Sequence, residues 1–481
     1  MLFMGVDAGT QGVRCSILDE RGYVAAAKSV PFSKLNIATE PGFFEQSPSD
    51  WERALAESAR ACVTELQNAG RSPDEIVSLS IDGTSGTIVP LDGAYQPLTN
   101  AIMYNDPRAR AEAKTVHDAM RAHEKKLGLA FGASFSLPRI LWVRDHQPDI
   151  YAKTRVFAHQ ADYIAGRLSG VYDMSDYSNA LKTGYDLIDE TWPSEIESAL
   201  GLDLAKFPRV IRPGAGVARL TKAAAAELGL STQTLVTGGS TDGYASALAA
   251  GAVKAGNWAS IIGTTFVLKG VTQRLVTDPD GSSYSHRLPS GEWLLGGASN
   301  LGGKCLNDCA GTKSLADMDA ASEPLVPTGC RCYPLTRRGE RFPFVYEAAE
   351  PFYVGDILGG RLYPALMEGV GFAEKFALEK MERLGCPVGD TVYATGGASR
   401  SDLWLRIRAS ILNRRLCVPA LVDASTGSAL LAASAHFGSL AQAASAMIRY
   451  QKTVEPESAW VAAYAEPYAR FRDDLKRMYG V

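Results

Sequence analysis

The sequence lacks any apolar run long enough to span a bilayer. Its first residues also lack the basic start and long apolar stretch of a signal peptide. The formal net charge of −4 gives no overall attraction to nucleic acid or to an anionic membrane surface. These absences predict a cytoplasmic protein that binds neither nucleic acid nor membrane.

Cysteine and histidine are both sparse. The chain has 8 Cys and 6 His, and the nearest cysteine pairs, Cys305 with Cys309 and Cys330 with Cys332, do not have the spacing of a zinc ribbon. We therefore expect free thiols that are buried in a protein from a reducing compartment. The histidines are isolated, and none anchors a Ser/His/Asp triad.

A Walker-type nucleotide loop is also absent, because no Gly-x-x-x-x-Gly-Lys-Ser/Thr sequence occurs. The chain has instead a series of turns built from small residues, at 5–12, 238–243, 263–265 and 396–399. Because glycine has no Cβ, such turns bring backbone N–H groups close to anions. Two of the turns contain an aspartate, Asp7 or Asp242. The set predicts phosphate, a metal ion and a proton acceptor in one cleft.

The length and the pattern of segments predict more than one α/β domain. At 481 residues the chain is long enough for two or more domains. Strand-like and helical segments alternate in both halves, as in α/β proteins. Helices are expected at 51–69, 108–127, 242–251, 362–384 and 401–412, and strands at 76–81, 234–238, 257–268, 292–295 and 391–395.

Residues 4–18 and 259–269 share the order strand, small-residue turn, strand. The alternation of apolar and polar residues after Asp7 makes its turn a hairpin turn and not a strand-to-helix phosphate loop. We interpret the repetition as a duplicated architecture. Since no low-complexity linker separates the halves, we expect two domains, 1–245 and 246–481, with a cleft and a hinge.

With these turns in this order, the chain resembles the FGGY carbohydrate kinases, a branch of the superfamily that contains hexokinase, actin and the heat-shock chaperone ATPases. The resemblance runs almost from end to end. It implies two actin/hexokinase-like (ribonuclease H-like) α/β domains that flank a central cleft for ATP and sugar. Segments similar to the D-ribulose kinases of bacteria and plants occur at 81–87, 176–182, 296–300 and 338–343.

The resemblance gives each turn a role. Asp242 would accept the proton of the sugar hydroxyl and contact the substrate, and Asp7 would anchor Mg²⁺ through water. The ATP-binding residues would be Thr10, Gln11, Gly263, Thr264, Thr265, Gly396, Gly397, Ala398 and Ser399. Without the resemblance, Asp242 is equally suited to capping the Ala-rich helix that follows it. A lone aspartate in a turn such as that of Asp7 would stabilise the turn itself, but Thr10 in the same turn favours the metal role.

Thr84, Ser85 and Asp106 are the further candidates for sugar contact. Thr84 and Ser85 offer hydroxyl groups that a polyol can use, although Thr84 is also placed to bond within the protein as a buried strand hydroxyl. Asp106 is equally suited to a bidentate sugar contact or to a salt bridge with Arg108.

The choice of sugar depends on Ser85-Gly86, which stands where xylulokinases usually have Met-His and so argues against D-xylulose. Residues 104–108 keep an acidic residue and an arginine that FGGY kinases of other substrates have. The expected activity is ATP-dependent phosphorylation of a pentulose, with D-ribulose to D-ribulose 5-phosphate as the main hypothesis. The same chemistry on D-xylulose, L-ribulose or a pentitol is the nearest alternative.

An alternative of another class is a sugar-independent, ATP-gated conformational protein. Asp242 together with the Thr84-Ser85 segment argues against it, because a sugarless ATPase has no need of a polyol pocket. The expected ligands are a small-molecule sugar, ATP and Mg²⁺, and a homodimer is a candidate assembly.

Overall fold

The computed structural model describes residues 1–358 and 360–481. The chain forms two compact units. Unit 1 consists of Met1–Ala249, His286–Gly291 and Asp423–Ile448, and unit 2 of Ala250–Ser285, Glu292–Val422 and Arg449–Val481. The sequence predicts one continuous domain over 246–481. The structure differs because the segment Asp423–Ile448 packs in unit 1.

Unit 1 contains a seven-stranded sheet with the strand order β11-β12-β5-β1-β2-β3, in which β13 also pairs with β5. The strands are β1 (Leu2–Ala8), β2 (Gly12–Asp19), β3 (Val24–Pro31), β5 (Ile76–Gly83), β11 (Gly216–Arg219), β12 (Leu235–Thr237) and β13 (Ser240–Thr241). β1 and β2 form the antiparallel hairpin that the sequence predicts, with Asp7 opposite Arg14. β1 also pairs in parallel with β5, which places Asp82 beside Asp7.

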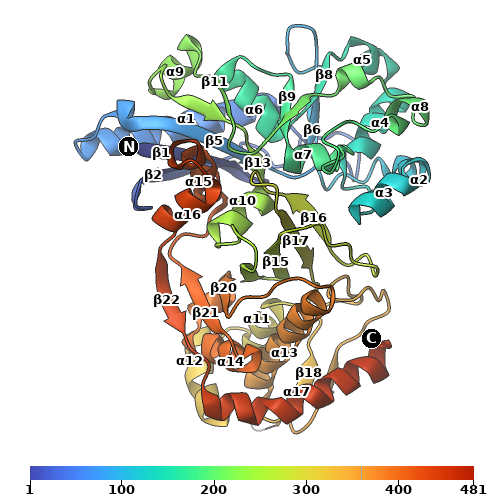
Figure 1. The fold of residues 1–481 in the computed structure, drawn as a ribbon, viewed down its shortest axis with the longest axis vertical. Coiled ribbons are helices and arrows are strands. Elements are labelled where there is room, and N and C mark those ends of the chain that lie inside the picture. Colours follow the sequence, from blue (N-terminus) through green and yellow to red (C-terminus); the bar gives the residue numbers. More distant parts are fainter. Residues whose placement is uncertain (359) are drawn as a thin grey trace. The chain divides into compact units, whose positions relative to one another are not determined.

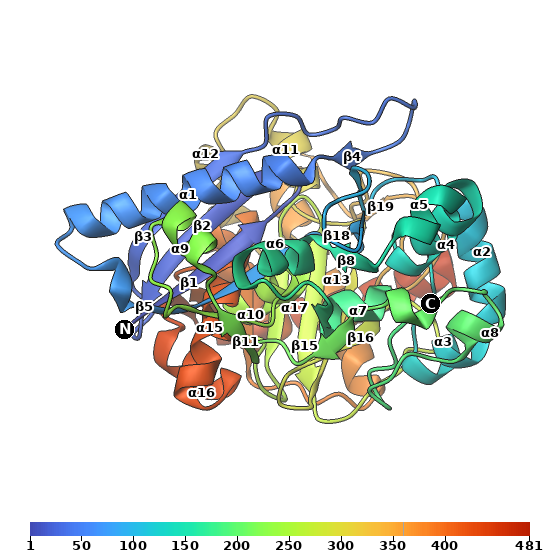
Figure 2. The same cartoon turned by 90° about the horizontal axis from the view of Figure 1, so that it is seen from above.

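The two faces of this sheet are covered by helices from distant parts of the chain. α1 (Pro48–Asn68) shares a core with the even-numbered residues of β1. On the other face, α15 (Ala424–Phe437) passes so close to Gly5 that a Cβ there would lie 1.7 Å from the Ser425 carbonyl oxygen. Figures 1 and 2 show α15 beside β1 and α1 along β2 and β3. Because strand residues alternate between faces, Asp7 lies on the α15 face.

The predicted helix at 51–69 is confirmed as α1. It begins with Pro48 at the first position, where a missing N–H costs nothing, and Asp50 in its first turn complements the helix dipole. Its buried side recurs every three to four residues, as an amphipathic helix requires. The larger residues on that side are Trp51, Leu55, Cys62, Val63 and Leu66.

The prediction of one helix over 108–127 is wrong in its continuity. The structure has two helices, α2 (Arg110–Ala119) and α3 (Arg121–Leu127). Between them Met120 has φ −105° and ψ 15°, and its side chain is buried. The chain turns there and places this apolar side chain in the interior.

The other elements of unit 1 complete its covering layers. A four-stranded sheet contains β4 (Glu45–Gln46), β7 (Ala101–Ile102), β6 (Ile88–Leu91) and β8 (Val156–His159), and a two-stranded one contains β9 (Met174–Asp176) and β10 (Arg209–Ile211). The remaining helices are α4 (Ser136–His146), α5 (Pro148–Lys153), α6 (Gln160–Ser169), α7 (Tyr177–Lys182), α8 (Glu195–Ser198), α9 (Lys222–Leu228), α10 (Asp242–Ala249) and α16 (Leu440–Met447).

Unit 2 repeats the strand arrangement of unit 1. Its main sheet runs, from β17 onward, in the order β17-β15-β14-β20-β21-β22. β14 pairs antiparallel with β15 and parallel with β20, as β1 does with β2 and β5. The strands are β14 (Trp258–Ile262), β15 (Phe266–Thr272), β17 (Trp293–Ala298), β20 (Thr391–Thr395), β21 (Arg415–Pro419) and β22 (Tyr450–Val454). The duplicated architecture expected from the sequence is therefore present.

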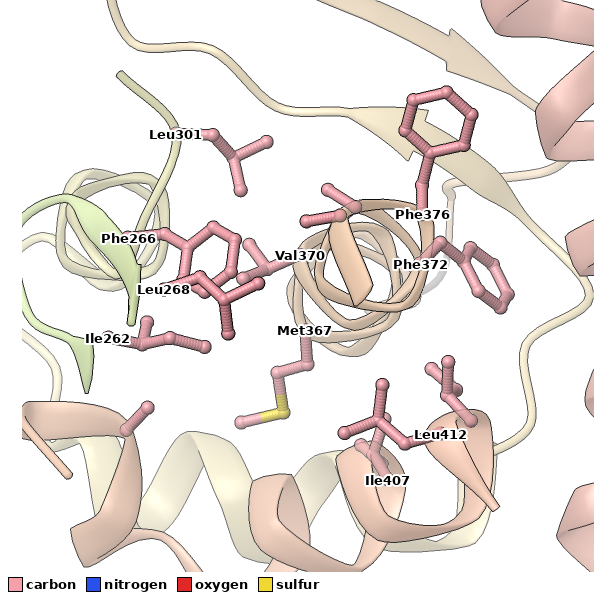
Figure 3. Packing of buried hydrophobic residues seen from close by; sticks show 14 of the residues in the cluster. Ile262, Phe266, Leu268, Leu301, Met367, Val370, Phe372, Phe376, Ile407 and Leu412 are labelled. Atoms are coloured by element: carbon pink, nitrogen blue, oxygen red, sulfur yellow. The ribbon is translucent and has the colours of Figure 1, made fainter. Parts of the chain in front are cut away.

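The core of unit 2 surrounds α13 (Leu362–Arg383), which confirms the helix predicted at 362–384. Figure 3 shows Val370 of α13 beside Phe266 and Leu268 of β15, with Ile407 and Leu412 on a neighbouring helix. The other helices are α11 (Lys304–Ala310), α12 (Leu315–Ser322), α14 (Asp402–Leu412) and α17 (Ser458–Tyr479), and β18 (Arg331–Tyr333) pairs with β19 (Phe352–Val354).

All eight cysteines are free thiols, and every one except Cys309 is buried. Within residues 1–358 and 360–481, no helix is both long and apolar enough to cross a membrane.

Candidate functional site

Three aspartates meet at the C-terminal ends of neighbouring strands in unit 1. Asp7 on β1 and Asp82 on β5 are in register, and Ser240 of β13 is aligned with Asp82. β13 ends at Thr241, so Asp242 comes next along the chain and begins α10. The charge of Asp242 acts on both Asp7 and Asp82. The two aspartates that the sequence singled out are therefore close in space, with Asp82 beside them.

Asp7 and Asp82 share a hydrogen bond between their carboxyl groups. Burial raises the pKa of Asp82 well above its ordinary value, and the charge of Asp7 raises it further. The Ser428 hydroxyl donates to Asp82 Oδ2 over 2.6 Å. Asp82 Oδ1 receives no N–H or O–H donor among the described residues. A hydrogen bond between two carboxyl groups requires a proton on one of them. The pair keeps this proton at pH values where an exposed carboxyl group has lost it.

Asp7 carries the charge of the pair. Burial raises its pKa to about 6, and the Asp242 and Asp423 carboxylates add to this effect, while the hydrogen bond from Asp82 and the Arg14 guanidinium lower the pKa. Arg14 forms an ion pair with Asp423, the residue before α15. The segment Asp423–Ile448 thus contributes to the electrostatics of a site built mainly from the first 250 residues.

Asp242 is partly exposed at the start of α10. The Gly243 N–H donates to its Oδ1 over 2.6 Å. The preceding residue is held as well, because the Thr241 N–H donates to the Ser178 hydroxyl over 2.8 Å. A carboxylate on a fixed backbone, with part of its surface in contact with solvent, can reach a ligand and accept a proton from it. Its place at the helix start is compatible with that role.

A pocket of about 410 Å³ lies at the first small-residue turn. The turn closes through the Gly9 N–H, which donates to the Gly12 carbonyl over 3.0 Å, and Gln46 Nε2 donates to the Thr10 carbonyl over 2.8 Å. Its lining residues are Asp7, Gly9, Thr10, Gln11, Gly12, Arg14, Ser29 and Pro31. Asp7, Thr10 and Gln11, which the sequence predicts to bind metal and phosphate, therefore line one pocket.

Thr84 is bonded within the protein. Its N–H and hydroxyl both reach Gln160 Oε1, at 2.9 and 2.7 Å, and its hydroxyl lies 2.6 Å from that of Thr87. These contacts match the alternative in which Thr84 is a buried structural hydroxyl. Ser85 differs, because its hydroxyl oxygen is buried and has no hydrogen-bond partner among the described residues.

Asp106 contacts Arg108. Its side chain is fully buried, and Arg108 donates to both of its oxygens, from Nε over 2.9 Å and from Nη2 over 2.8 Å. The Phe44 N–H adds a bond of 2.6 Å to Oδ2, and Arg108 extends the network to Glu45. Protein groups thus occupy both carboxylate oxygens, which favours the salt-bridge alternative over a sugar contact.

In unit 2, two of the predicted ATP-binding turns line the same pocket of about 480 Å³. The turn between β14 and β15 contributes Gly263 and Thr264, and the turn after β20 contributes Gly397 and Ala398. The other lining residues are Gly303, Leu306, Asn307, Leu315, Ala316, Asp319, Tyr363, Arg400, Ser401 and Trp404. Glycine backbone, apolar side chains and a few polar groups form the kind of lining that a nucleotide needs.

Thr265, Gly396 and Ser399 shape these turns. The Gly263 N–H donates to the Thr265 carbonyl over 3.0 Å, and the Ser399 hydroxyl donates to the Gly396 carbonyl over 2.7 Å. Gly396 has φ +84°, and a Cβ there would lie 2.5 Å from the Ile262 carbonyl oxygen. Only glycine fits this position without strain.

Two features of the site were missed from the sequence. Asp82 was not assigned to the aspartate group, although a polar residue at the end of a buried strand is a usable signal. The pocket wall formed by α11 and α12 carries no motif, so residues such as Leu306 and Leu315 could not be found. Within the described ranges, no three His, Cys, Asp or Glu side chains gather as metal ligands. A bound Mg²⁺ would therefore depend on water and phosphate for most of its ligands.

Known proteins resemble the chain along its whole length. Residues 2–249 match the N-terminal domain of the FGGY family of carbohydrate kinases, and residues 258–436 its C-terminal domain. Xylulose kinase of Bacillus subtilis (strain 168) is 28% identical over 480 residues, which cover 96% of this chain and 94% of that protein. Xylulose kinase of Streptomyces rubiginosus is 29% identical over 429 residues, which cover 87% and 84%.

A crystal structure of a xyloylose kinase from Brucella ovis superposes with a TM-score of 0.88 at 25% identity and covers 100% of both chains. The similarity confirms the fold predicted from the sequence, two domains of the actin/hexokinase-like α/β type.

Proposed function

Because this chain belongs to the FGGY family of carbohydrate kinases, we propose that it transfers the γ-phosphoryl group of ATP, the co-substrate of the family, to a hydroxyl group of a pentulose. The observation that carries the proposal is the meeting of Asp7, Asp82 and Asp242 at one end of the unit 1 sheet. Transfer to a sugar needs a proton acceptor and a cation anchor close together, and these carboxyl groups meet that need.

Asp242 is the proposed base. As the sugar oxygen bonds to the γ-phosphorus, the phosphorus–oxygen bond to ADP breaks and the hydroxyl proton passes to the Asp242 carboxylate. The Gly243 N–H on Oδ1 and the anchored Thr241 N–H hold the carboxylate in place. Orientation of this kind lowers the barrier because the reacting groups need not find each other in the transition state.

Asp7 is the proposed anchor for Mg²⁺. It lines the pocket at the first turn with Thr10, and Asp82 leaves the charge of the pair on it. The residues fit a magnesium ion that keeps most of its waters, because Mg²⁺ in kinases is held by one or two carboxylates and the phosphates. When bound, the ion would neutralise phosphate charge. Arg14 lies in the same pocket and adds a positive charge.

The small-residue turns are the proposed binding elements for ATP. Thr10 and Gln11 would present amide and hydroxyl groups to phosphate in unit 1, and Gly263 and Thr264 would do so in unit 2. Support comes from the pockets that these residues line. The apolar wall beside Gly397 suits an adenine ring, since flat aromatic groups gain most from apolar contact.

D-Xylulose is the proposed sugar. Two FGGY relatives that match along most of this chain are named xylulose kinases, although a gluconokinase matches a similar share of it. The xylulose kinases favour the D-xylulose alternative over the D-ribulose hypothesis. D-Ribulose remains the second candidate because of one observation: Ser85, at the place of the Met-His of xylulokinases, has a buried hydroxyl oxygen without a protein partner. A ligand hydroxyl could supply that partner.

A coupled ADP-release assay over D-xylulose, D-ribulose, L-ribulose and pentitols tests this proposal. We expect ADP to form only when a sugar is added, with the highest kcat/KM for D-xylulose. Highest kcat/KM for D-ribulose would restore the earlier hypothesis. ADP formation at the same rate without any sugar would support the ATP-gated conformational protein and overturn the kinase proposal.

A further inference from the structure

Gln160 is a buried glutamine whose side chain faces the sugar-site segment around Thr84. It is the first residue of α6 and is 0% exposed. A Cβ on Gly83, at the end of β5, would lie 3.3 Å from the Gln160 Cβ. The side chain therefore reaches the strand end where Asp82 lies.

The hydrogen bonds fix which way the Gln160 amide points. Two donors, the N–H and the hydroxyl of Thr84, reach the same atom, Oε1. The Thr84 N–H alone already requires an acceptor at this position, because a backbone N–H can only donate. An atom that receives two donors must be the oxygen. The NH₂ group therefore lies on the opposite side, where it is buried and has no acceptor within the described residues.

Two more orphaned polar atoms are close by in the fold. One is Ser85 Oγ, on the residue after Thr84. The other is Asn179 Oδ1, on the short helix α7. Asn179 Nδ2 donates to Asp176 Oδ2 over 2.7 Å, so its oxygen is turned away from that contact. The residue before it, Ser178, receives the N–H of Thr241. Gln160 Nε2, Ser85 Oγ and Asn179 Oδ1 thus have no hydrogen-bond partner among the described residues. All three belong to segments near the strand that precedes Asp242.

We propose that Gln160 is a sugar-recognising residue, whose NH₂ group donates to a hydroxyl oxygen of the acceptor sugar, and that Thr84 positions it. Buried N–H groups are nearly always paired, and leaving one unpaired costs free energy that a ligand acceptor recovers. The inference rests on the proposed function and names a recognition element of that site. It also changes the role of Thr84 from direct sugar contact to orientation of Gln160.

Gln160→Met tests the inference, because methionine has similar length but no N–H donor. We expect the sugar KM to rise about 10–100-fold, as the loss of one buried hydrogen bond implies, while the ATP KM stays within about twofold. Thermal shift with sugar alone gives a readout without catalysis: the sugar-induced rise in Tm of the wild type should be lost. Thr84→Val should weaken sugar binding in the same direction but less, since Gln160 loses the Thr84 hydroxyl donor and keeps the N–H of residue 84.

Gln160→Glu is the matched control for folding. A glutamate keeps an acceptor for Thr84, and once its carboxyl group is ionised it has no donor for the sugar. Because burial raises the pKa of a carboxyl group, this variant should bind sugar more weakly than the wild type at pH values above that pKa. If the wild type responds to sugar and both Gln160 variants bind sugar within about twofold of it, the inference is wrong and the NH₂ group is satisfied by water. If no sugar raises the Tm of the wild type, the proposed function is wrong, and so is the inference that rests on it.

Discussion

Asp7 and Asp82 lie in register on parallel strands, and their carboxyl groups are joined by a hydrogen bond. Such a bond needs a proton. Since Asp82 is fully buried and Asp7 faces a pocket, the proton remains with Asp82 and the charge with Asp7. One negative charge therefore faces the phosphate turn, close to Asp242.

The pKa of Asp7 predicts a pH dependence. Burial raises it to about 6, so the carboxyl group is charged above this pH and neutral below it. If the charge anchors Mg·ATP, kcat/KM for Mg·ATP should fall as the pH is lowered through about 6. Asp7→Asn should remove this limb of the profile between pH 5 and 8 and raise the Mg²⁺ concentration needed for half-maximal rate. A mutant with the profile and Mg²⁺ requirement of the wild type would show that Asp7 only shapes its turn.

Asp242→Asn should keep the fold and the affinity for ATP but lose most turnover. The asparagine can accept the Gly243 N–H as Asp242 does, but it cannot take the hydroxyl proton. A positioned base contributes ~10²–10⁴-fold to a rate, and kcat should fall by that factor. The measurement is kcat together with nucleotide affinity by calorimetry. A kcat near that of the wild type would eliminate Asp242 as the base.

Ser85→Ala should change the preference between D-ribulose and D-xylulose without changing ATP affinity. These sugars differ in the configuration at C3, and a hydroxyl side chain that bonds one epimer is left unpaired with the other, which costs ~1–3 kcal/mol. Competition kinetics with both ketoses measures the ratio directly. An unchanged ratio of the two kcat/KM values would mean that Ser85 does not form a hydrogen bond with the C3 hydroxyl group.

Gly396→Ala should destabilise the protein, whereas Gly397→Ala serves as its matched control. Gly396 has φ +84° and a carbonyl oxygen 2.5 Å from where a Cβ would lie. For Gly397, no atom lies within 4 Å of that point. With ψ −171°, Gly396 lies in an extended positive-φ region that only glycine adopts readily, and another residue there costs ~1–3 kcal/mol before any clash. Thermal unfolding should show a lower Tm for Gly396→Ala alone. Equal Tm values would contradict the assigned turn geometry.

Glu368→Gln should become more stabilising as pH rises. Glu368 in α13 is buried beside Thr328 and Tyr464, and burial raises its pKa to about 7 from 4.5. Because the folded state holds this proton more tightly than the unfolded state, the wild type loses stability between about pH 5 and 7, by about 2–3 kcal/mol in total. Glutamine does not titrate. Denaturant unfolding at pH 5 and pH 8 measures the free energy of unfolding of both proteins. Between these pH values the variant should gain stability relative to the wild type. An unchanged difference in the free energy of unfolding would contradict the raised pKa of Glu368.

The sequence was sufficient for the local parts of the fold. The hairpin around Asp7 could be predicted because alternation after the turn is a short-range signal, and the helix at 51–69 because its apolar spacing is regular. The break at Met120 could not, since burial of that side chain depends on contacts made by the whole unit. The same holds for Asp423–Ile448, whose packing against β1 joins residues separated by more than four hundred positions.

The candidate site also contains some residues that a local sequence pattern can reveal and others that it cannot. Asp7, Asp242 and the turns at Gly263 and Gly397 could be found because small residues around a polar one stand out in a sequence. The position of Asp82 at the end of a strand is visible in the sequence, but its place beside Asp7 depends on the parallel pairing of β1 with β5, which no local pattern reveals. Neither the bonding of Thr84 to Gln160 nor that of Asp106 to Arg108 follows from residue type alone, because each of these side chains suits a ligand as well as a protein partner.

The most direct test of the central proposal is to quantify ADP and sugar phosphate in one reaction containing the wild-type protein, Mg·ATP and D-xylulose. The account predicts one molecule of phosphorylated pentulose for every ADP and no ADP in the absence of sugar. ADP without an equal amount of sugar phosphate, or no product from any pentulose, would contradict it.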